Sequence, residues 1–216
     1  MVHTSGGHNL SLLQVMMDWL RAMLPEWNIT NLTTDFNDGR ALLVLLDRIK
    51  PGLVPVKTLD PTKRRNNCAL AINQARIHLK VPAIISNDDL SNPDVDELST
   101  MTYLSQFLQV ASTNLLKWVR KTIPGRTVKN LTTDWNDGTR LAALLETKFP
   151  GTIPDANQMS PEDARENIER CFEVAEQRIG ILPNMRVEEL MSPTVDELPV
   201  MTLLTYIRCV ERVCVC

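Results

Sequence analysis

Five cationic side chains lie within thirteen residues near the middle of the chain, with no acidic residue among them. This basic cluster consists of Lys117, Arg120, Lys121, Arg126 and Lys129. The spacing i, i+3, i+4 of its first three members places them on one face of a helix. Such a face could bind an acidic protein surface or phosphoinositide headgroups, where each cation contributes about 1 kcal/mol. A solvated face without a partner is the alternative.

A second basic group, Lys63-Arg64-Arg65, falls in the first turn of another predicted helix. Cations oppose the helix dipole at this end, which makes their placement unusual. A solvated turn is the simpler interpretation.

The Asp-x-Asn-Asp-Gly segments that start at Asp35 and Asp134 suggest calcium binding at first sight. An EF-hand loop needs glycine at its sixth position and glutamate at its twelfth. Counted from Asp35, the sixth residue is Arg40. We therefore interpret the segments as helix starts, with Asn37 or Asp38 as the cap, and expect no metal site.

Residues suited to catalysis are few. The three histidines are His3, His8 and His78, and the chain has neither a glycine-rich phosphate loop nor Cys and His at ligand spacing. Cys68 and His78 share one predicted helix, but ten residues of helix separate them by about 15 Å, too far for a nucleophile and its base. The sequence predicts no enzyme and no cofactor.

The elements that position these residues occur twice. Asn-Leu-Thr-Thr-Asp-Phe-Asn-Asp-Gly at 31–39 returns as Asn-Leu-Thr-Thr-Asp-Trp-Asn-Asp-Gly at 130–138, and Val-Asp-Glu-Leu at 95–98 returns at 195–198. The offset is 99 residues for the first motif and 100 for the second. Two repeats of this length are too few for a solenoid, so each copy should have its own core.

Apolar residues within each copy recur at helical spacing. The chain should therefore be all-α, with two tandem domains of about four main helices each. Asp60-Pro61 and Ser160-Pro161 predict the start of the third helix, and Asp96 and Asp196 that of the last. The predicted inward positions are Leu12, Met16, Trp19, Leu20, Met23, Leu42, Leu45, Leu46, Ile49, Cys68, Ile72, Ala75, Leu79, Leu98, Met101 and Leu104 in the first copy.

The predicted domains span residues 10–108 and 114–212, with a short linker at 109–113 in which Ser112 or Thr113 caps the next helix. Residues 1–9 should form a disordered tail and 213–216 a cysteine-containing tail.

Composition excludes several classes of protein. Lysine and arginine number 23 against 26 acids, so no overall positive field favours nucleic acid as a partner. The longest apolar run, 41–46, is far shorter than the ~18 residues of a membrane span. No secretory signal is visible and the five cysteines are too few for a disulfide framework, which favours a cytoplasmic protein. The fate of Cys214 and Cys216 stays open.

The motif Leu-Thr-Thr-Asp-Phe-Asn-Asp-Gly-Arg-Ala-Leu at 32–42, the helix that begins Val-Asp-Glu-Leu at 95, and the first helices with Trp19 and Trp118 resemble calponin-homology domains. Each copy is most similar to the type 2 domain of the filamin pair. The resemblance implies an all-helical tandem, a cytoskeletal location and binding to F-actin. It departs from filamins in that their first domain is of type 1 and supplies most of the affinity.

Carried over by position, the actin-contacting segments of the family fall on Leu10–Arg21, Met101–Val110 and Asn114–Lys121. We expect Arg21, Met101 and Gln106 to contribute to binding together with the basic cluster, with weak to moderate affinity for filaments. The alternative is an adaptor that binds another protein or an acidic phosphoinositide surface instead of actin.

Overall fold

The computed structural model describes residues 11–53 and 59–213, with side chains up to Val210, and all regular elements in these ranges are helical. The all-α prediction is thereby confirmed. The predicted N-terminal tail at 1–9 lies outside the described residues, as does the cysteine-containing tail apart from Val213.

Corresponding helices build the two copies. The first copy contains α1 (Leu12–Met23), α2 (Arg40–Ile49), α3 (Arg64–Gln74), α4 (Asn87–Ser91) and the beginning of α5 (Glu97–Thr122). The second contains the end of α5, α6 (Thr139–Lys148), α7 (Ala164–Val174), α8 (Val187–Met191) and α9 (Glu197–Val213). A five-residue π-helical turn, Ala75–Leu79 or Ala175–Ile179, continues α3 and α7.

Local chemistry explains most of these boundaries. Ser11 and Asp96 are the N-caps of α1 and α5, and their side chains accept hydrogen bonds from the backbone N–H groups of Gln14 and Ser99. The run 41–46 is buried on every side, which makes α2 the central helix of its copy. Gly180 ends the π turn in the left-handed conformation, which glycine adopts without strain.

Three local predictions were wrong. The third helix begins at Arg64 and not at Pro61, because residues 61–62 form a turn before it. Leu12 was expected to face inward, yet 63% of it is exposed, and the same expectation is wrong for Leu98, which is 65% exposed. Leu98 lies in the first turn of α5, and its counterpart Leu198 in α9 is half-buried against the core.

The predicted break at 109–113 is absent, since α5 runs through it as one helix of 26 residues. Ser112 does not cap a helix; its hydroxyl instead bonds the carboxylate of Glu197 at the start of α9. The Thr113 hydroxyl donates to the Gln109 carbonyl one turn earlier, at 2.9 Å. No glycine or proline occurs between Glu97 and Ile123, so nothing in the local sequence stops the helix.

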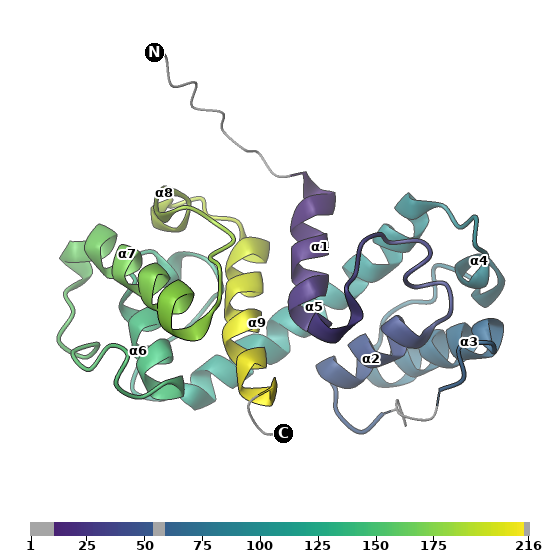
Figure 1. The fold of residues 1–216 in the computed structure, drawn as a ribbon, viewed down its shortest axis with the longest axis horizontal. Coiled ribbons are helices and arrows are strands. Elements are labelled where there is room, and N and C mark those ends of the chain that lie inside the picture. The colour runs from purple at the N-terminus through teal and green to yellow at the C-terminus, as the bar shows by residue number, and fades with distance from the viewer. Residues whose placement is uncertain (1–10, 54–58, 214–216) are drawn as a thin grey trace, which may run out of the picture.

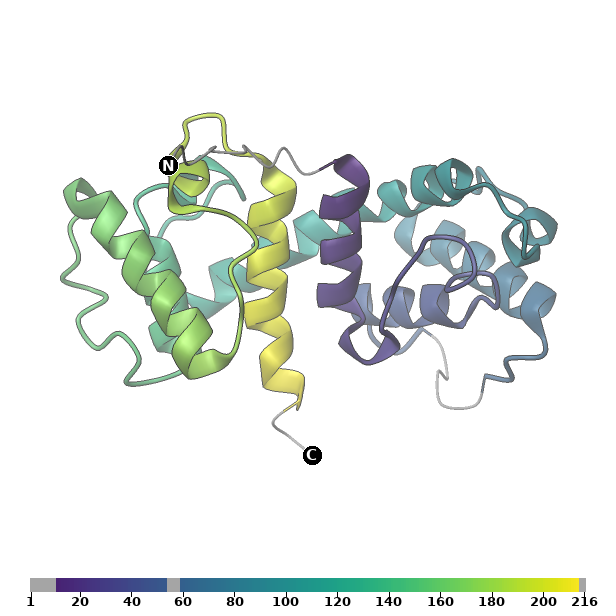
Figure 2. The ribbon, with the colours of Figure 1, turned by 45° about the horizontal axis from the view of Figure 1, so that its top comes forward.

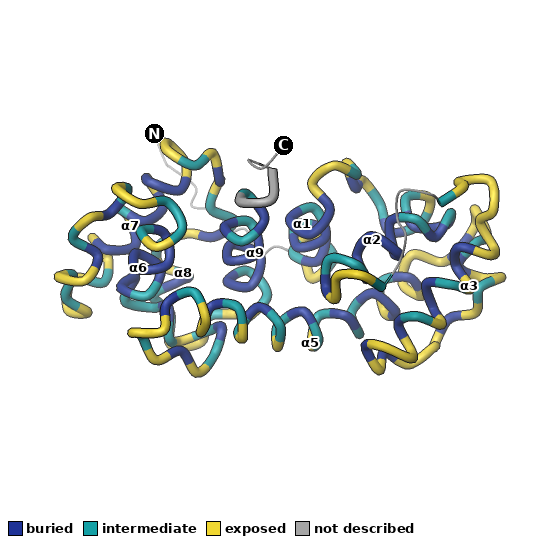
Figure 3. The backbone as a smooth tube through the Cα atoms, turned by 90° about the horizontal axis from the view of Figure 1, so that it is seen from below, coloured by how far each residue is buried: buried dark blue, intermediate teal, exposed yellow. Residues whose placement is uncertain are grey.

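The two copies meet where α1 packs on α9, the most extensive contact between any two elements in the described part of the chain. Figures 1 and 2 show α1 (purple) and α9 (yellow) side by side and running in the same direction. Figure 3 looks along both helices and shows α5 passing beneath them from one copy to the other. Buried side chains of the two copies therefore form one continuous apolar cluster, and the expectation of two separate cores was wrong.

Candidate functional surface

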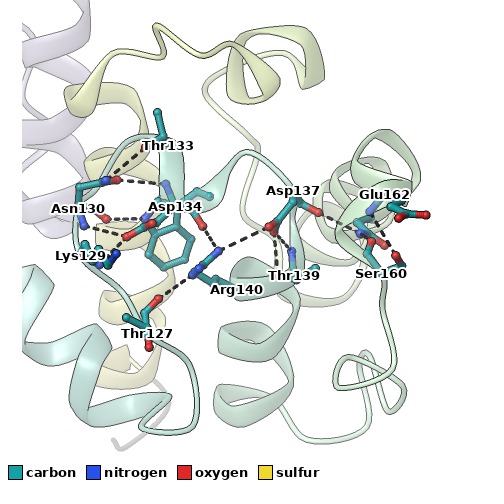
Figure 4. A network of polar contacts seen from close by, with 12 residues as sticks. Thr127, Lys129, Asn130, Thr133, Asp134, Asp137, Thr139, Arg140, Ser160 and Glu162 are labelled. Carbon is teal, nitrogen blue, oxygen red and sulfur yellow. Dashed lines mark hydrogen bonds and ion pairs between the residues drawn. The ribbon is translucent and has the colours of Figure 1, made fainter.

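The repeated Asn-Asp motif stabilises a loop through hydrogen bonds to the loop's own backbone. We call residues 28–39 and 127–138 the repeat loops. In the second loop, shown in Figure 4, the Asp134 carboxylate accepts from the N–H groups of Lys129 and Asn130, and the Asn130 side-chain oxygen accepts from the N–H groups of Thr132 and Asp134. Asp35 and Asn31 make the corresponding bonds in the first loop. These oxygens therefore serve the backbone of their own loop.

Each repeat loop ends in a helix start that needs glycine. The Asp38 carboxylate accepts from the Arg40 N–H at 2.9 Å, which agrees with a role in capping, although the N-cap residue itself is Gly39. Gly39 has φ +77°, and a Cβ there would lie 2.6 Å from the backbone nitrogen of Cys68. The Asn67 amide donates to the Asp38 carbonyl at 3.0 Å, which holds α3 against this turn. Gly138 and Asn167 repeat the arrangement.

Three lysines of the basic cluster are free to meet a partner. Lys117, Lys121 and Lys129 are exposed, and their ammonium groups have no hydrogen bond or ion pair with any described residue. Lys117 and Lys121 lie one turn apart on the last part of α5, and Lys129 follows in the second repeat loop. These three ammonium groups are therefore accessible to an acidic partner, as an anion-binding surface requires.

The two arginines of the cluster hold the fold together. The Arg120 guanidinium donates to the Val128 carbonyl at 2.7 Å and the Lys129 carbonyl at 3.2 Å. Arg126 donates to the Ala156 carbonyl at 3.2 Å. Backbone carbonyls occupy these donors, so we assign the anion-binding role to the lysines first.

Arg21 proves to be the first-copy counterpart of Arg120. Its guanidinium donates to the Ile29 carbonyl at 3.0 Å and pairs with Asp18 at 3.1 Å. The segment around it is largely covered, since Met16, Met17, Trp19, Leu20, Ala22 and Met23 are all buried. The exposed face expected for α1 shrinks to Ser11, Leu12 and Gln14, and Leu10 lies outside the described residues.

Met101 and Gln106 lie on the first half of α5 and are half-buried. The Gln106 amide donates to the Thr102 carbonyl, one turn earlier in the same helix. The structure thus spreads the predicted contact residues along α5 and onto α1, and only the lysines combine exposure with an unpaired charge.

Sequence reasoning missed the cations around Trp118. Its half-buried ring lies 5.6 Å from the Lys148 ammonium and 5.6 Å from the Arg208 guanidinium, distances suited to cation–π contact. Arg208 comes from α9, ninety residues further along the chain. No local pattern could have indicated this arrangement.

A metal site, a membrane-spanning helix and a reactive cysteine are the other features that the described residues could have provided. They contain no group of three or more His, Cys, Asp or Glu side chains placed to hold a metal, and no helix long and apolar enough to cross a bilayer. Burial raises the pKa of the Cys68 thiol to about 12, and burial likewise raises that of Cys171 to about 12. Both cysteines behave as small core residues at neutral pH.

The model of the calponin homology (CH) domain matches residues 10–113 and again residues 109–211. The chain belongs to the calponin-homology family. As a CH tandem it is similar to Filamin-C of Rattus norvegicus, with 41% identity over 95 residues that cover 44% of this chain and 4% of the relative. It is also similar to Filamin-A of Drosophila melanogaster, with 27% identity over 82% of this chain and 9% of the relative.

The erythrocytic spectrin beta chain of Mus musculus is a third relative of this CH tandem, with 26% identity over 81% of this chain and 9% of the relative. This chain therefore spans less than a tenth of the length of each of these relatives. The filamin-like resemblance expected from the repeated motifs is confirmed.

Proposed function

We propose that this CH tandem binds the side of actin filaments and has no catalytic role. The observation that carries the proposal is the pairing of two CH domains with an exposed basic surface on the helix they share, formed by Lys117 and Lys121 with Lys129 beside it. Actin filaments are acidic, so unpaired ammonium groups on a rigid helix are suited to them.

The covering of α1 supports an affinity in the weak to moderate range. Among the segments implied by the family resemblance, the first supplies mostly side chains that α9 and the core already bury. Binding must then rest mainly on the lysines, whose attraction is screened by salt over about 8 to 10 Å at physiological ionic strength.

Co-sedimentation with filaments at increasing salt tests the proposal. We expect the wild-type chain to pellet with actin at low salt and progressively less as salt rises. The double change Lys117→Glu with Lys121→Glu should weaken binding at least about tenfold, equivalent to about 1.4 kcal/mol. A matched control reverses two exposed lysines elsewhere, Lys50→Glu with Lys80→Glu, and should bind like wild type.

Phosphoinositide vesicles separate this proposal from the adaptor alternative. A chain that fails to pellet even at high filament concentration, yet binds vesicles through the same lysines, would overturn actin binding. If the double variant bound filaments as tightly as wild type, the basic surface would not be the binding site.

A further inference from the structure

Opposite charges mark equivalent surfaces of the two copies. Between residues 61 and 87 the first copy has five lysines and arginines and no acid, a net charge of +5. Residues 161–187 of the second copy have six acids against four arginines, a net charge of −2. These segments contain α3 and α7, which occupy the same place in the repeat.

The difference follows one helix face. Glu166, Glu169, Glu173 and Glu176 stand at spacing i, i+3, i+7, i+10 and form an acidic stripe along α7 and the turn after it. The same positions of α3 and the turn after it hold Asn66, Ala69, Asn73 and Arg76, and Lys63 and Arg64 lie where α3 begins. The four glutamates of the acidic stripe and the four residues at the same positions in the first copy are all exposed.

Few of the glutamates in the acidic stripe form ion pairs with other described residues. Arg165 pairs with Glu169 and with Glu188 of α8. Glu166, Glu173 and Glu176 have no cationic partner among the described residues.

On the basic side Arg65 pairs with Asp88 of α4. Lys63 and Arg64 make no side-chain bond to a described residue, and Arg76 bonds only the neutral Asn73 amide at 3.1 Å. Three unpaired carboxylates on one face thus correspond to three cations without a carboxylate partner on the other.

The basic face is also hollowed and partly apolar. A surface depression of about 400 Å³ lies between α3 and residues 83–87, and no acidic residue lines it. Ile84, which lines the depression, is 51% exposed, and Ile77 in the turn after α3 is 43% exposed. The second copy has Leu182, 70% exposed, just beyond the acidic stripe. Each face therefore adds apolar surface to its charge.

The two faces lie at opposite ends of the molecule. Figures 1 and 2 show α3 at the end formed by the first copy and α7 at the end formed by the second, with α1, α9 and the middle of α5 between them. Contact between such ends on neighbouring molecules leaves the α1–α9 packing untouched. A single molecule cannot bring its own two ends together.

We propose that the chain associates head to tail, with the acidic α7 face of one molecule docked on the basic, hollowed α3 face of a second copy. Two different surfaces meet in this contact, so it is heterologous and can extend from molecule to molecule. Exposed ion pairs contribute little individually and are screened by salt, so the association is weak and strongest at low ionic strength. It does not depend on actin binding.

Sedimentation velocity of the full chain under reducing conditions tests this contact. At 50 mM salt and 20 to 500 µM protein, we expect the weight-average sedimentation coefficient to rise with concentration, and at 300 mM salt to stay constant. The basic-end variant K63E/R64E/R76E and the acidic-end variant E166K/E173K/E176K should each remain monomeric at 50 mM salt. Glutamate at positions 63 and 64 is favourable to the helix dipole, so the first variant should fold.

An equimolar mixture of the two variants is the decisive sample. The unchanged acidic face of one variant then meets the unchanged basic face of the other, and association should return but stop at dimers, because each molecule keeps only one unchanged face. The control K50E/K117E/K121E reverses as many charges away from both faces and should associate like wild type, even if its binding to filaments is lost. A wild-type chain that is monomeric throughout, association that does not respond to salt, or a mixture that stays monomeric would each overturn the proposal.

Discussion

α1 and the second half of α5 occupy the same place in the two repeats but meet different surroundings. Both place an arginine, Arg21 or Arg120, against carbonyls of the following repeat loop. The position of Asp18, which neutralises Arg21, is taken by Lys117 in the second copy. The second copy therefore keeps the framework contact and gains an exposed positive charge.

The tryptophans at this place differ in the same way. Trp19 is fully buried, whereas Trp118 is half-buried and contacted by two cations. α1, the first helix of its copy, packs on α9, the last helix of the other copy. The equivalent partner for the second half of α5 would be the first half of α5, but the two halves form one continuous helix and cannot pack on each other. Residues at the same position of the repeat thus make the same contacts within their own copy. Whether their side chains stay exposed depends on which of them the other copy covers.

Breaking the continuous helix α5 should cause the largest loss of stability. Ser112→Pro removes a backbone hydrogen bond in mid-helix and should lower the free energy of unfolding by about 3 kcal/mol or more. Ser112→Ala, which keeps the helix and loses only the bond to Glu197, should cost about 1 kcal/mol. Thermal and urea unfolding of both variants measures the difference. Equal stability of the two would mean that continuity of α5 does not contribute to the fold.

The glycines that end the repeat loops should come next. Gly39→Ala and Gly138→Ala combine a left-handed φ with a Cβ 2.6 or 2.8 Å from its nearest neighbour, and we expect each to cost about 2 to 3 kcal/mol. Gly180→Ala shares the positive φ but has open space around it, so strain alone should cost about 1 kcal/mol. Similar losses for all three in urea unfolding would contradict the close packing of the loops on α3 and α7.

Alanine substitutions that compare the carbonyl-bonded arginines with the exposed lysines should give the smallest changes in stability. Arg21→Ala and Arg120→Ala each remove bonds to backbone carbonyls and should cost about 1 kcal/mol in urea unfolding. Lys117→Ala removes no contact and should change stability by less than about 0.5 kcal/mol. A loss from Lys117→Ala as large as that from Arg120→Ala would show that this lysine also supports the fold.

Local patterns identified the helices and the repeat because their causes lie within a few residues. The capping by Asp96 and the buried run at 41–46 follow from residue type and spacing. The glycine of each repeat loop could also be located, although the close approach of α3 that demands it could not. The basic cluster was visible as a run of charge, but its division into bonded arginines and free lysines depends on carbonyls that only the folded loops bring close.

The sequence alone determined that the chain is a pair of similar helical domains and that positive charge gathers after residue 116. Only the tertiary structure decided that one helix joins the copies and that α1 is covered by α9. It also decided which charges remain unpaired. The stretch at 109–113 has no helix breaker, so its sequence permits continuity, and the helix ends just before Pro124-Gly125. The covering of α1 by α9, in contrast, depends on packing between residues far apart in the chain. Burial and ion pairing are properties of such long-range neighbours, which local patterns do not specify.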